Sequence, residues 1–165
     1  MSRAAKLVES CATGLAYVGV LAAFLLTAVV TYSVGARYVF NAPQIWADEL
    51  ATYCLLVMVF FGLAHTLLTD GHVRADFVVE RLSATARWYF NLFSHVVASL
   101  FAAVLLLGAL SAVANFVNRN THSSDGMQIP LAIPASVMIV GCALFLAAAV
   151  TRTLQMLLSA RDKAR

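Results

Sequence analysis

Apolar residues are gathered into four long blocks along the chain, and polar residues fall mainly between these blocks. Each block is longer than the roughly 20 residues that a helix needs to cross about 30 Å of hydrocarbon. Inside lipid, only a helix satisfies the backbone hydrogen bonds of such segments. The pattern therefore predicts four transmembrane helices, at about residues 12–34, 47–68, 88–113 and 132–158.

The composition agrees with this pattern. Of the 165 residues, 62% are hydrophobic and 12% are charged, whereas soluble domains have roughly 45–50% apolar residues. The connections between the blocks are short, and the sequence contains neither an internal repeat nor a low-complexity stretch. We therefore expect an all-α integral membrane protein whose residues 1–165 form a single membrane domain.

The first block has an alternative interpretation as a signal peptide, because Arg3 and Lys6 precede it and small residues follow near 34–36. Signal peptides have an apolar region of about 7–15 residues. This block is longer and three further spans follow it, which favours a retained transmembrane helix.

The basic residues predict the orientation. Nine Lys and Arg residues belong to the N-terminal tail, the middle connection or the C-terminal end, whereas the other two connections contain only Arg37 and Arg119. Basic residues concentrate on the cytoplasmic side of membrane proteins. Both termini and the middle connection are therefore predicted to be cytoplasmic. The same distribution explains the formal net charge of +3, so the expected partner is the lipid bilayer and not nucleic acid.

The start of the second span carries two adjacent acids, Asp48 and Glu49, just after Trp46. A helix N-terminus favours negative charge, and Trp suits the membrane interface. A second hypothesis is that one acid pairs with a cation, either Arg37 or a basic group on another subunit, since unpaired charges near lipid are costly. A proton or cation site is a weaker alternative, because both acids lie at the rim of the membrane.

The middle connection reads DGHVRADFVVERLSATAR. Its apolar residues recur at helical spacing with charged residues around them, which predicts a short amphipathic helix at about 71–87 in the plane of the interface. The alternative is a solvated loop against the lipid headgroups. Ser83 is expected to cap the third span.

The connection before the fourth span contains the steps Ile129-Pro130 and Ile133-Pro134. A proline restricts the residue before it to extended or bent backbone. We therefore expect a broken, partly embedded start of the fourth helix. Such backbone needs protein around it at membrane depth, so this segment is expected to pack against the bundle or against a partner.

The sequence gives little support to a cofactor-binding protein, an enzyme or a transporter that acts alone. His65 and His95, one in each of the second and third spans, leave open a haem-binding or redox subunit. A lone histidine in a span is more often a hydrogen-bonding residue between helices. The three cysteines are isolated and lack metal-site spacing. A stand-alone homodimeric transporter is another alternative, although no central acidic residue supports it. We predict no cofactor, no metal site and no enzymatic activity.

Three motifs, in order, resemble one known family: RYVFNAPQIWADELATY, FFGLAHTLLTDGHVRADFV and SSDGMQIPLAIP. The family is the small, DctQ-like membrane subunit of tripartite ATP-independent periplasmic (TRAP) transporters. The chain differs from the common family pattern at Val57, where many members have Trp, and at Val140-Gly141, where Pro-Gly is usual.

This resemblance implies a scaffold subunit that braces a large transport subunit, while a periplasmic solute-binding protein delivers a carboxylate-bearing solute and an ion gradient drives import. It also implies the cytoplasmic (inner) membrane of a bacterium or archaeon. His72, Arg74 and Asp76 match the family pattern in the middle connection. The candidate subunit-interface residues are Arg37, Trp46, Asp48, Glu49, His72, Arg74, Asp76, Pro130 and Pro134.

Overall fold

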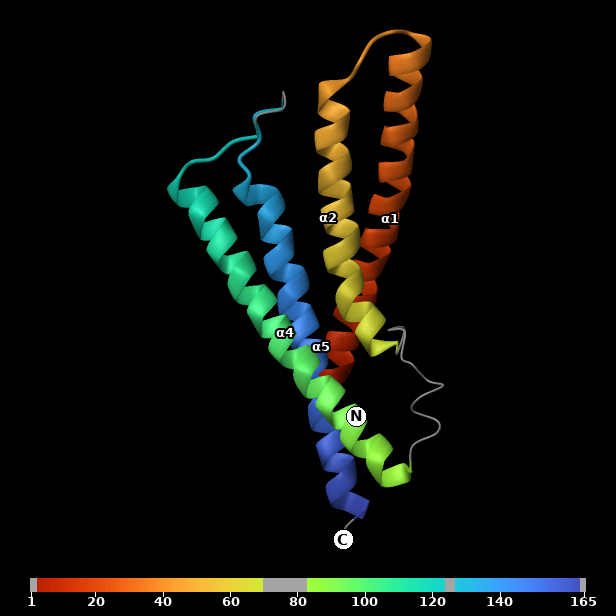
Figure 1. Cartoon of the computed structure of the whole chain (residues 1–165), viewed down its shortest axis with the longest axis vertical. Helices are drawn as coiled ribbons and strands as arrows, with labels where there is room; N and C mark the ends of the chain where they lie inside the picture. The colour runs from red at the N-terminus through yellow and green to blue at the C-terminus, as the bar shows by residue number, and fades with distance from the viewer. Residues whose placement is uncertain (1–2, 70–82, 124–126, 164–165) are drawn as a thin grey trace.

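The computed structural model describes residues 3–69, 83–123 and 127–163. These residues form four helices (Figure 1): α1 (Arg3–Val39), α2 (Ile45–Leu68), α4 (Ala84–Asn118) and α5 (Ala132–Lys163). All four are long and apolar enough to cross a membrane. The predicted fold class, an all-α protein with four transmembrane helices, is confirmed.

Each helix includes its predicted span, and three of the four extend well beyond it. α1 begins nine residues before the predicted start at residue 12 and ends five residues after residue 34. The apolar pattern marks only the part that matches the hydrocarbon. A helix that has been nucleated continues through neighbouring polar residues at little cost, which explains why the helices are longer than the apolar blocks.

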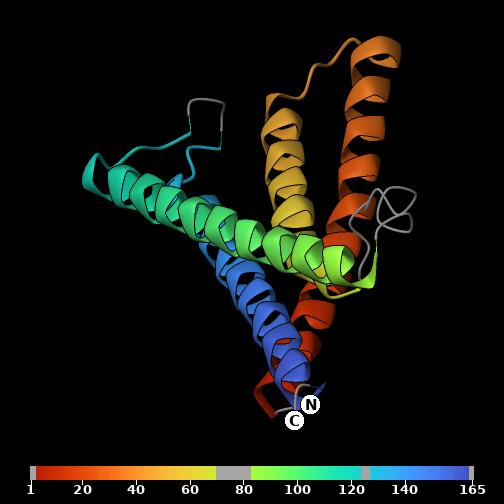
Figure 2. The same cartoon turned by 60° about the horizontal axis from the view of Figure 1, so that its bottom comes forward.

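The helices form two pairs, α1 with α2 and α4 with α5, and the pairs meet mainly where α2 packs on α5. Figures 1 and 2 show that the pairs diverge toward one end of the bundle. There, residues 40–44 join α1 to α2 and residues 119–131 join α4 to α5, and we name it the loop end. Both chain termini lie at the opposite end, the termini end, as an even number of spans requires (Figure 2).

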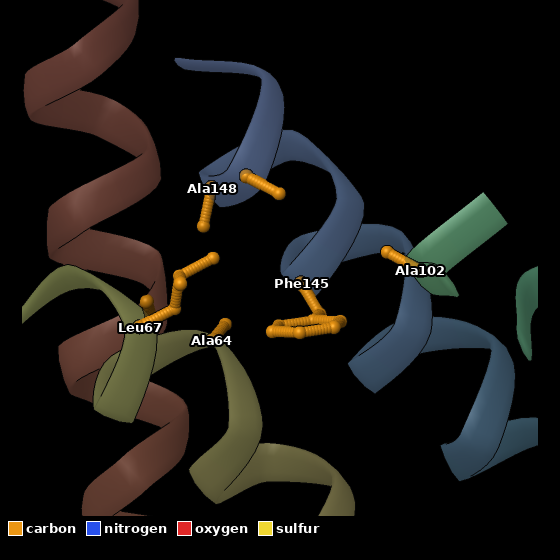
Figure 3. Close-up of a cluster of buried hydrophobic side chains, with 7 residues drawn as sticks. Ala64, Leu67, Ala102, Phe145 and Ala148 are labelled. Atoms are coloured by element: carbon orange, nitrogen blue, oxygen red, sulfur yellow. The ribbon is translucent and has the colours of Figure 1, made fainter. Parts of the chain in front are cut away.

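The main buried cluster lies between the two pairs (Figure 3). Phe145 of α5 points toward Ala64 and Leu67 of α2, and Ala102 of α4 lies on the other side of α5. Most of the cluster is alanine: Ala12, Ala64, Ala102, Ala148 and Ala149. Such small residues let membrane helices approach closely, so that dispersion contacts between backbones stabilise the bundle.

Two glycines set the closest approaches to α2. A β-carbon built at Gly19 of α1 would lie 3.5 Å from the Met58 carbonyl oxygen, and one built at Gly141 of α5 would lie 2.5 Å from that of Phe60. α2 is therefore held from two sides by backbone-to-backbone contacts in its middle.

The helix ends follow from local chemistry. The predicted capping role of Ser83 is confirmed, since its side-chain oxygen accepts a hydrogen bond from the Ala86 N–H. α4 ends with Asn120 at a φ of 46°, a left-handed conformation that Asn tolerates better than most residues. The Thr121 N–H bonds the Phe116 carbonyl and the Asn120 N–H bonds the Val117 carbonyl, which together form a Schellman motif.

The predicted amphipathic helix at 71–87 lies for the most part outside the described residues. Its last positions, from Ala84, belong to the first turn of α4. The membrane-facing character of this segment stays a prediction.

Candidate functional site at the loop end

Arg37 and Asp48 form an ion pair between the last turn of α1 and the first turn of α2. The Nη2 and Oδ2 atoms are 3.7 Å apart, and the two side chains are 51% and 74% exposed. Each charge has the sign that its helix end favours. An exposed pair of this kind contributes only about 0–1 kcal/mol, so both groups stay free to meet a charged group on a partner.

Trp46 lies in the first turn of α2, two residues before Asp48. Its indole N–H donates a hydrogen bond of 2.8 Å to the Gln44 side-chain oxygen. Its ring centroid lies 6.1 Å from that of Tyr32 on α1, with the planes tilted by 31°. The two amphipathic rings suit the level of the lipid headgroups, which agrees with a loop end at the membrane surface.

Glu49 has a very different environment from Asp48, although the two residues are adjacent. Glu49 is only 6% exposed, and the Tyr53 hydroxyl donates a hydrogen bond of 2.5 Å to its Oε1. Its Oε2 is buried and has no hydrogen-bond partner among the described residues. The hydroxyl hydrogen bond to Oε1 favours the charged form of this buried carboxylate.

The sequence contains a signal for this arrangement that the prediction missed. Glu49 and Tyr53 are four residues apart, which places them on the same face of a helix. Asp48 is offset from that face by about 100°. The prediction left open which acid would pair with Arg37, and the helix turns Asp48 toward Arg37 and Glu49 toward the bundle.

The connection between α4 and α5 is an ordered strip at both of its described ends. His122 and Pro130 form an antiparallel bridge. The Ser123 N–H donates to the Ile129 carbonyl at 2.9 Å, and the Leu131 N–H donates to the Thr121 carbonyl at 3.0 Å. Pro130 is tolerated there because it offers only its carbonyl group, which accepts a bond from the Ile133 N–H.

The prediction of a broken start for the fourth helix is wrong. α5 is continuous from Ala132, and Pro134 lies in its first turn. At that position a proline lacks only an N–H that would have no partner within the helix. The two Ile-Pro steps differ, because Pro134 belongs to the first turn of α5, whereas Pro130 belongs to the connection.

Arg152 makes a link at the termini end that the sequence analysis did not single out. This α5 side chain is partly buried, and its Nη2 donates a hydrogen bond to the carbonyl oxygen of Leu68, the last residue of α2. A cation at a helix C-terminus meets unsatisfied carbonyl groups and the negative end of the dipole. The candidate residues His72, Arg74 and Asp76 follow directly in the chain but lie outside the described residues.

The two histidines of the haem hypothesis lie on α2 and α4, and α5 packs against both of these helices. The carbonyl groups of His65 and His95 accept hydrogen bonds from Thr69 and Ser99. Within residues 3–69, 83–123 and 127–163, no three His, Cys, Asp or Glu side chains form a possible metal site.

Four membrane-spanning helices with short connections and a polar cluster at the loop end define a small multi-pass membrane protein. Comparison with known proteins identifies its family. The family model described as "Tripartite ATP-independent periplasmic transporters, DctQ component" matches residues 26–159. The chain belongs to this family of TRAP transporter small permease subunits, which confirms the resemblance found in the sequence. Proteins of this family are permease subunits and not enzymes, as predicted.

Two curated relatives are similar to parts of the chain. The sialic acid TRAP transporter small permease protein SiaQ of Vibrio cholerae serotype O1 is 34% identical over 62 residues, which are 38% of this chain and 36% of the relative. The C4-dicarboxylate TRAP transporter small permease protein DctQ of Rhodobacter capsulatus is 32% identical over 91 residues, 53% of this chain and 38% of the relative. The matches therefore span little more than a third of either relative.

Proposed function

We propose that this chain is the small scaffold subunit of a TRAP-type importer for carboxylate-bearing solutes. The observation that carries the proposal is the family match over residues 26–159. The names of the two relatives refer to sialic acid and to C4-dicarboxylates, both of which carry carboxylate groups. A solute of the same chemical class is therefore the expected cargo.

In this proposal the solute does not pass through the chain itself. The main buried cluster between the helix pairs consists of alanine, leucine and phenylalanine side chains, which offer no ligands to a polar solute. A large membrane subunit would carry the solute inward on an ion gradient. A periplasmic solute-binding protein would deliver it at the loop end, where Asp48, Arg37 and Trp46 are accessible.

The long apolar faces of α1 and α4 support a bracing role within the membrane. Large side chains stay exposed along both helices, among them Leu21, Phe24, Phe93, Leu100 and Leu107. In a membrane, lipid or a neighbouring subunit covers such faces. By its family, the chain is expected in the cytoplasmic membrane of a bacterium or archaeon, and the count of basic residues predicts that its termini are in the cytoplasm.

The test is affinity purification of the tagged chain from its native membranes in mild detergent, followed by mass spectrometry and an absorption spectrum. A larger polytopic membrane protein present in stoichiometric amount would support the scaffold role. A chain that is purified alone and transports solute after reconstitution would contradict it and favour the homodimeric transporter. A Soret band would favour the haem-binding subunit.

A further inference from the structure

Arg152 is a charged residue within the apolar part of α5. It belongs to the candidate membrane span Ala132–Leu157, where an unpaired charge is costly. Its Nη2 donates a hydrogen bond to the carbonyl oxygen of Leu68, the last residue of α2. The last four carbonyl groups of a helix have no partner within the helix, whereas those of the middle turns are already bonded. The bond is therefore specific to this end of α2.

A second specific contact lies nearer the middle of both helices, where Gly141 of α5 meets the backbone of Phe60 in α2. Both helices begin at the loop end and so run in the same direction (Figure 1). By the rise per residue, the two contacts are about 12 Å apart along α2 and about 16 Å apart along α5. Long helical side chains point toward the N-terminus of their helix, so the Arg152 side chain reaches back over the difference of about 4 Å.

The contacts between these two points are mostly small and apolar. The buried cluster includes Ala64 of α2 and both Ala148 and Ala149 of α5. Apolar contacts are not directional, and the angles between packed helices scatter by about 15–20° around their preferred values. The close contact at Gly141 alone would leave α2 and α5 free to pivot about it. A directional bond at a second point restricts the angle between them.

α4 is linked to α5 at the level of Arg152. The hydroxyl oxygen of Thr153, the next residue of α5, lies 3.4 Å from that of Ser99 on α4. Ala102, three residues further along α4, belongs to the same buried cluster as Ala149. The angle between α2 and α5 is therefore also the angle between the two helix pairs.

We propose that Arg152 is a positioning residue that sets the angle at which the two helix pairs diverge toward the loop end. Gly141 is the pivot, and the bond from Arg152 to the end of α2 is the second point that fixes the angle. Because the loop end lies on the other side of the pivot, a change at Arg152 alters the separation of the pairs there. The inference concerns the chain alone and does not depend on the proposed transporter partners.

Spin labels at the loop end measure this separation by double electron–electron resonance of the full chain in lipid nanodiscs. Ile45→Cys and Ile133→Cys place the labels on exposed residues in the first turns of α2 and α5. Cys11→Ser removes the exposed native thiol, whereas Cys54 and Cys142 are buried. This parent chain should give a narrow distribution of distances between the two labels.

Arg152→Met keeps the length of the side chain but removes the donor to the Leu68 carbonyl. The distance distribution should then broaden or shift by about 5 Å, since a change of about 15° in the angle acts over an arm of about 20 Å. Arg152→Lys retains a cationic donor and should give a narrower distribution than Arg152→Met. The matched control is Lys6→Met, which removes an exposed cation of α1 at the same end and should leave the distribution unchanged.

An unchanged distribution in Arg152→Met, or equal broadening in Lys6→Met, would overturn the proposal. If Arg152→Met does not fold, solid-state NMR of the parent chain in lipid decides, with 15N in arginine and 13C in the leucine carbonyl groups. The hydrogen bond places a guanidinium nitrogen of Arg152 within about 4 Å of the Leu68 carbonyl carbon. A dipolar coupling between these two nuclei supports the second point of contact, and its absence rejects it.

Discussion

Gly141 of α5 lies directly against the backbone of Phe60 in α2, so closely that a β-carbon at Gly141 would be 2.5 Å from the Phe60 carbonyl oxygen and 2.7 Å from its β-carbon. Side chains rarely determine how close two helices come when both backbones are already in contact. Here the absence of a side chain at one position sets the separation of the two helix pairs.

Gly141→Ala should therefore destabilise the bundle. The neighbour is backbone, which cannot rotate away, and overpacking costs roughly 1–3 kcal/mol. The helix propensity of Ala, which is greater than that of Gly, offsets at most about 1 kcal/mol of this loss of stability. The measurement is the thermal unfolding midpoint in detergent. Gly108→Ala is the control, since nothing lies within 4 Å of a β-carbon there, and equal midpoints for the two variants would contradict the prediction.

Arg152→Met should loosen the end of α2. The change keeps the length of the side chain but removes the donor to the Leu68 carbonyl. We expect a loss of about 1–3 kcal/mol in stability, typical of a hydrogen bond from a charged group. Chemical unfolding in mixed micelles measures this loss. Arg152→Lys, which keeps a cation at the helix terminus, should recover part of it, and no difference between the Met and Lys variants would refute the role of the charge.

Asp48→Asn should have little effect on the stability of the chain, because the exposed pair with Arg37 contributes about 0–1 kcal/mol. If Asp48 contacts a partner, the same change should reduce the amount of large subunit that is purified with the chain. The double change of Asp48 to Asn and Glu49 to Gln extends this test to solute uptake. Unchanged assembly and uptake would leave only the helix dipole to explain these acids.

The middle connection offers an independent test of assembly. Replacing His72, Arg74 and Asp76 together by Ala should reduce recovery of the complex, because these side chains are predicted to fix the connection against the large subunit. The control replaces Lys6 and Glu9 by Ala, two exposed charged residues of α1 near the same end. Normal recovery of the complex from the triple variant would count against the prediction.

The predicted orientation can be measured by thiol labelling in intact cells. Asn120→Cys places a thiol in the exposed connection after α4, and Cys11→Ser removes the exposed native thiol. A membrane-impermeant maleimide should label residue 120 before lysis. Lys6→Cys in the same background should be labelled only after lysis. The reverse pattern would place the termini outside and contradict the count of basic residues.

The sequence predicts the spans well because each depends on local composition alone, as the agreement of 47–68 with Ile45–Leu68 shows. The Ser83 cap was predictable for the same reason, since a cap acts on the next three residues. The Arg37–Asp48 pair was an open possibility, and the short connection brings the two together.

The inward position of Glu49 was harder to predict. The rotation of α2 decides which of two adjacent acids faces the bundle, and that rotation depends on how α2 packs along α1 and α5. The link from Arg152 to Leu68 likewise depends on how far α5 extends beside α2. Such features arise from the packing of whole helices, so the local sequence pattern gives only a weak indication of them.

The length of α1 has a consequence for how the protein sits in a bilayer. Its 37 residues span about 55 Å, whereas the hydrocarbon layer is roughly 30 Å thick and helix tilts seldom exceed about 40°. Tilt alone cannot bring the whole helix within the layer. With Tyr32, Tyr38 and Trp46 holding the loop end at one lipid surface, the first turns of α1 must extend beyond the hydrocarbon at the other surface, to the level of the lipid headgroups or further. The polar residues of these turns, among them Lys6 and Glu9, suit that level.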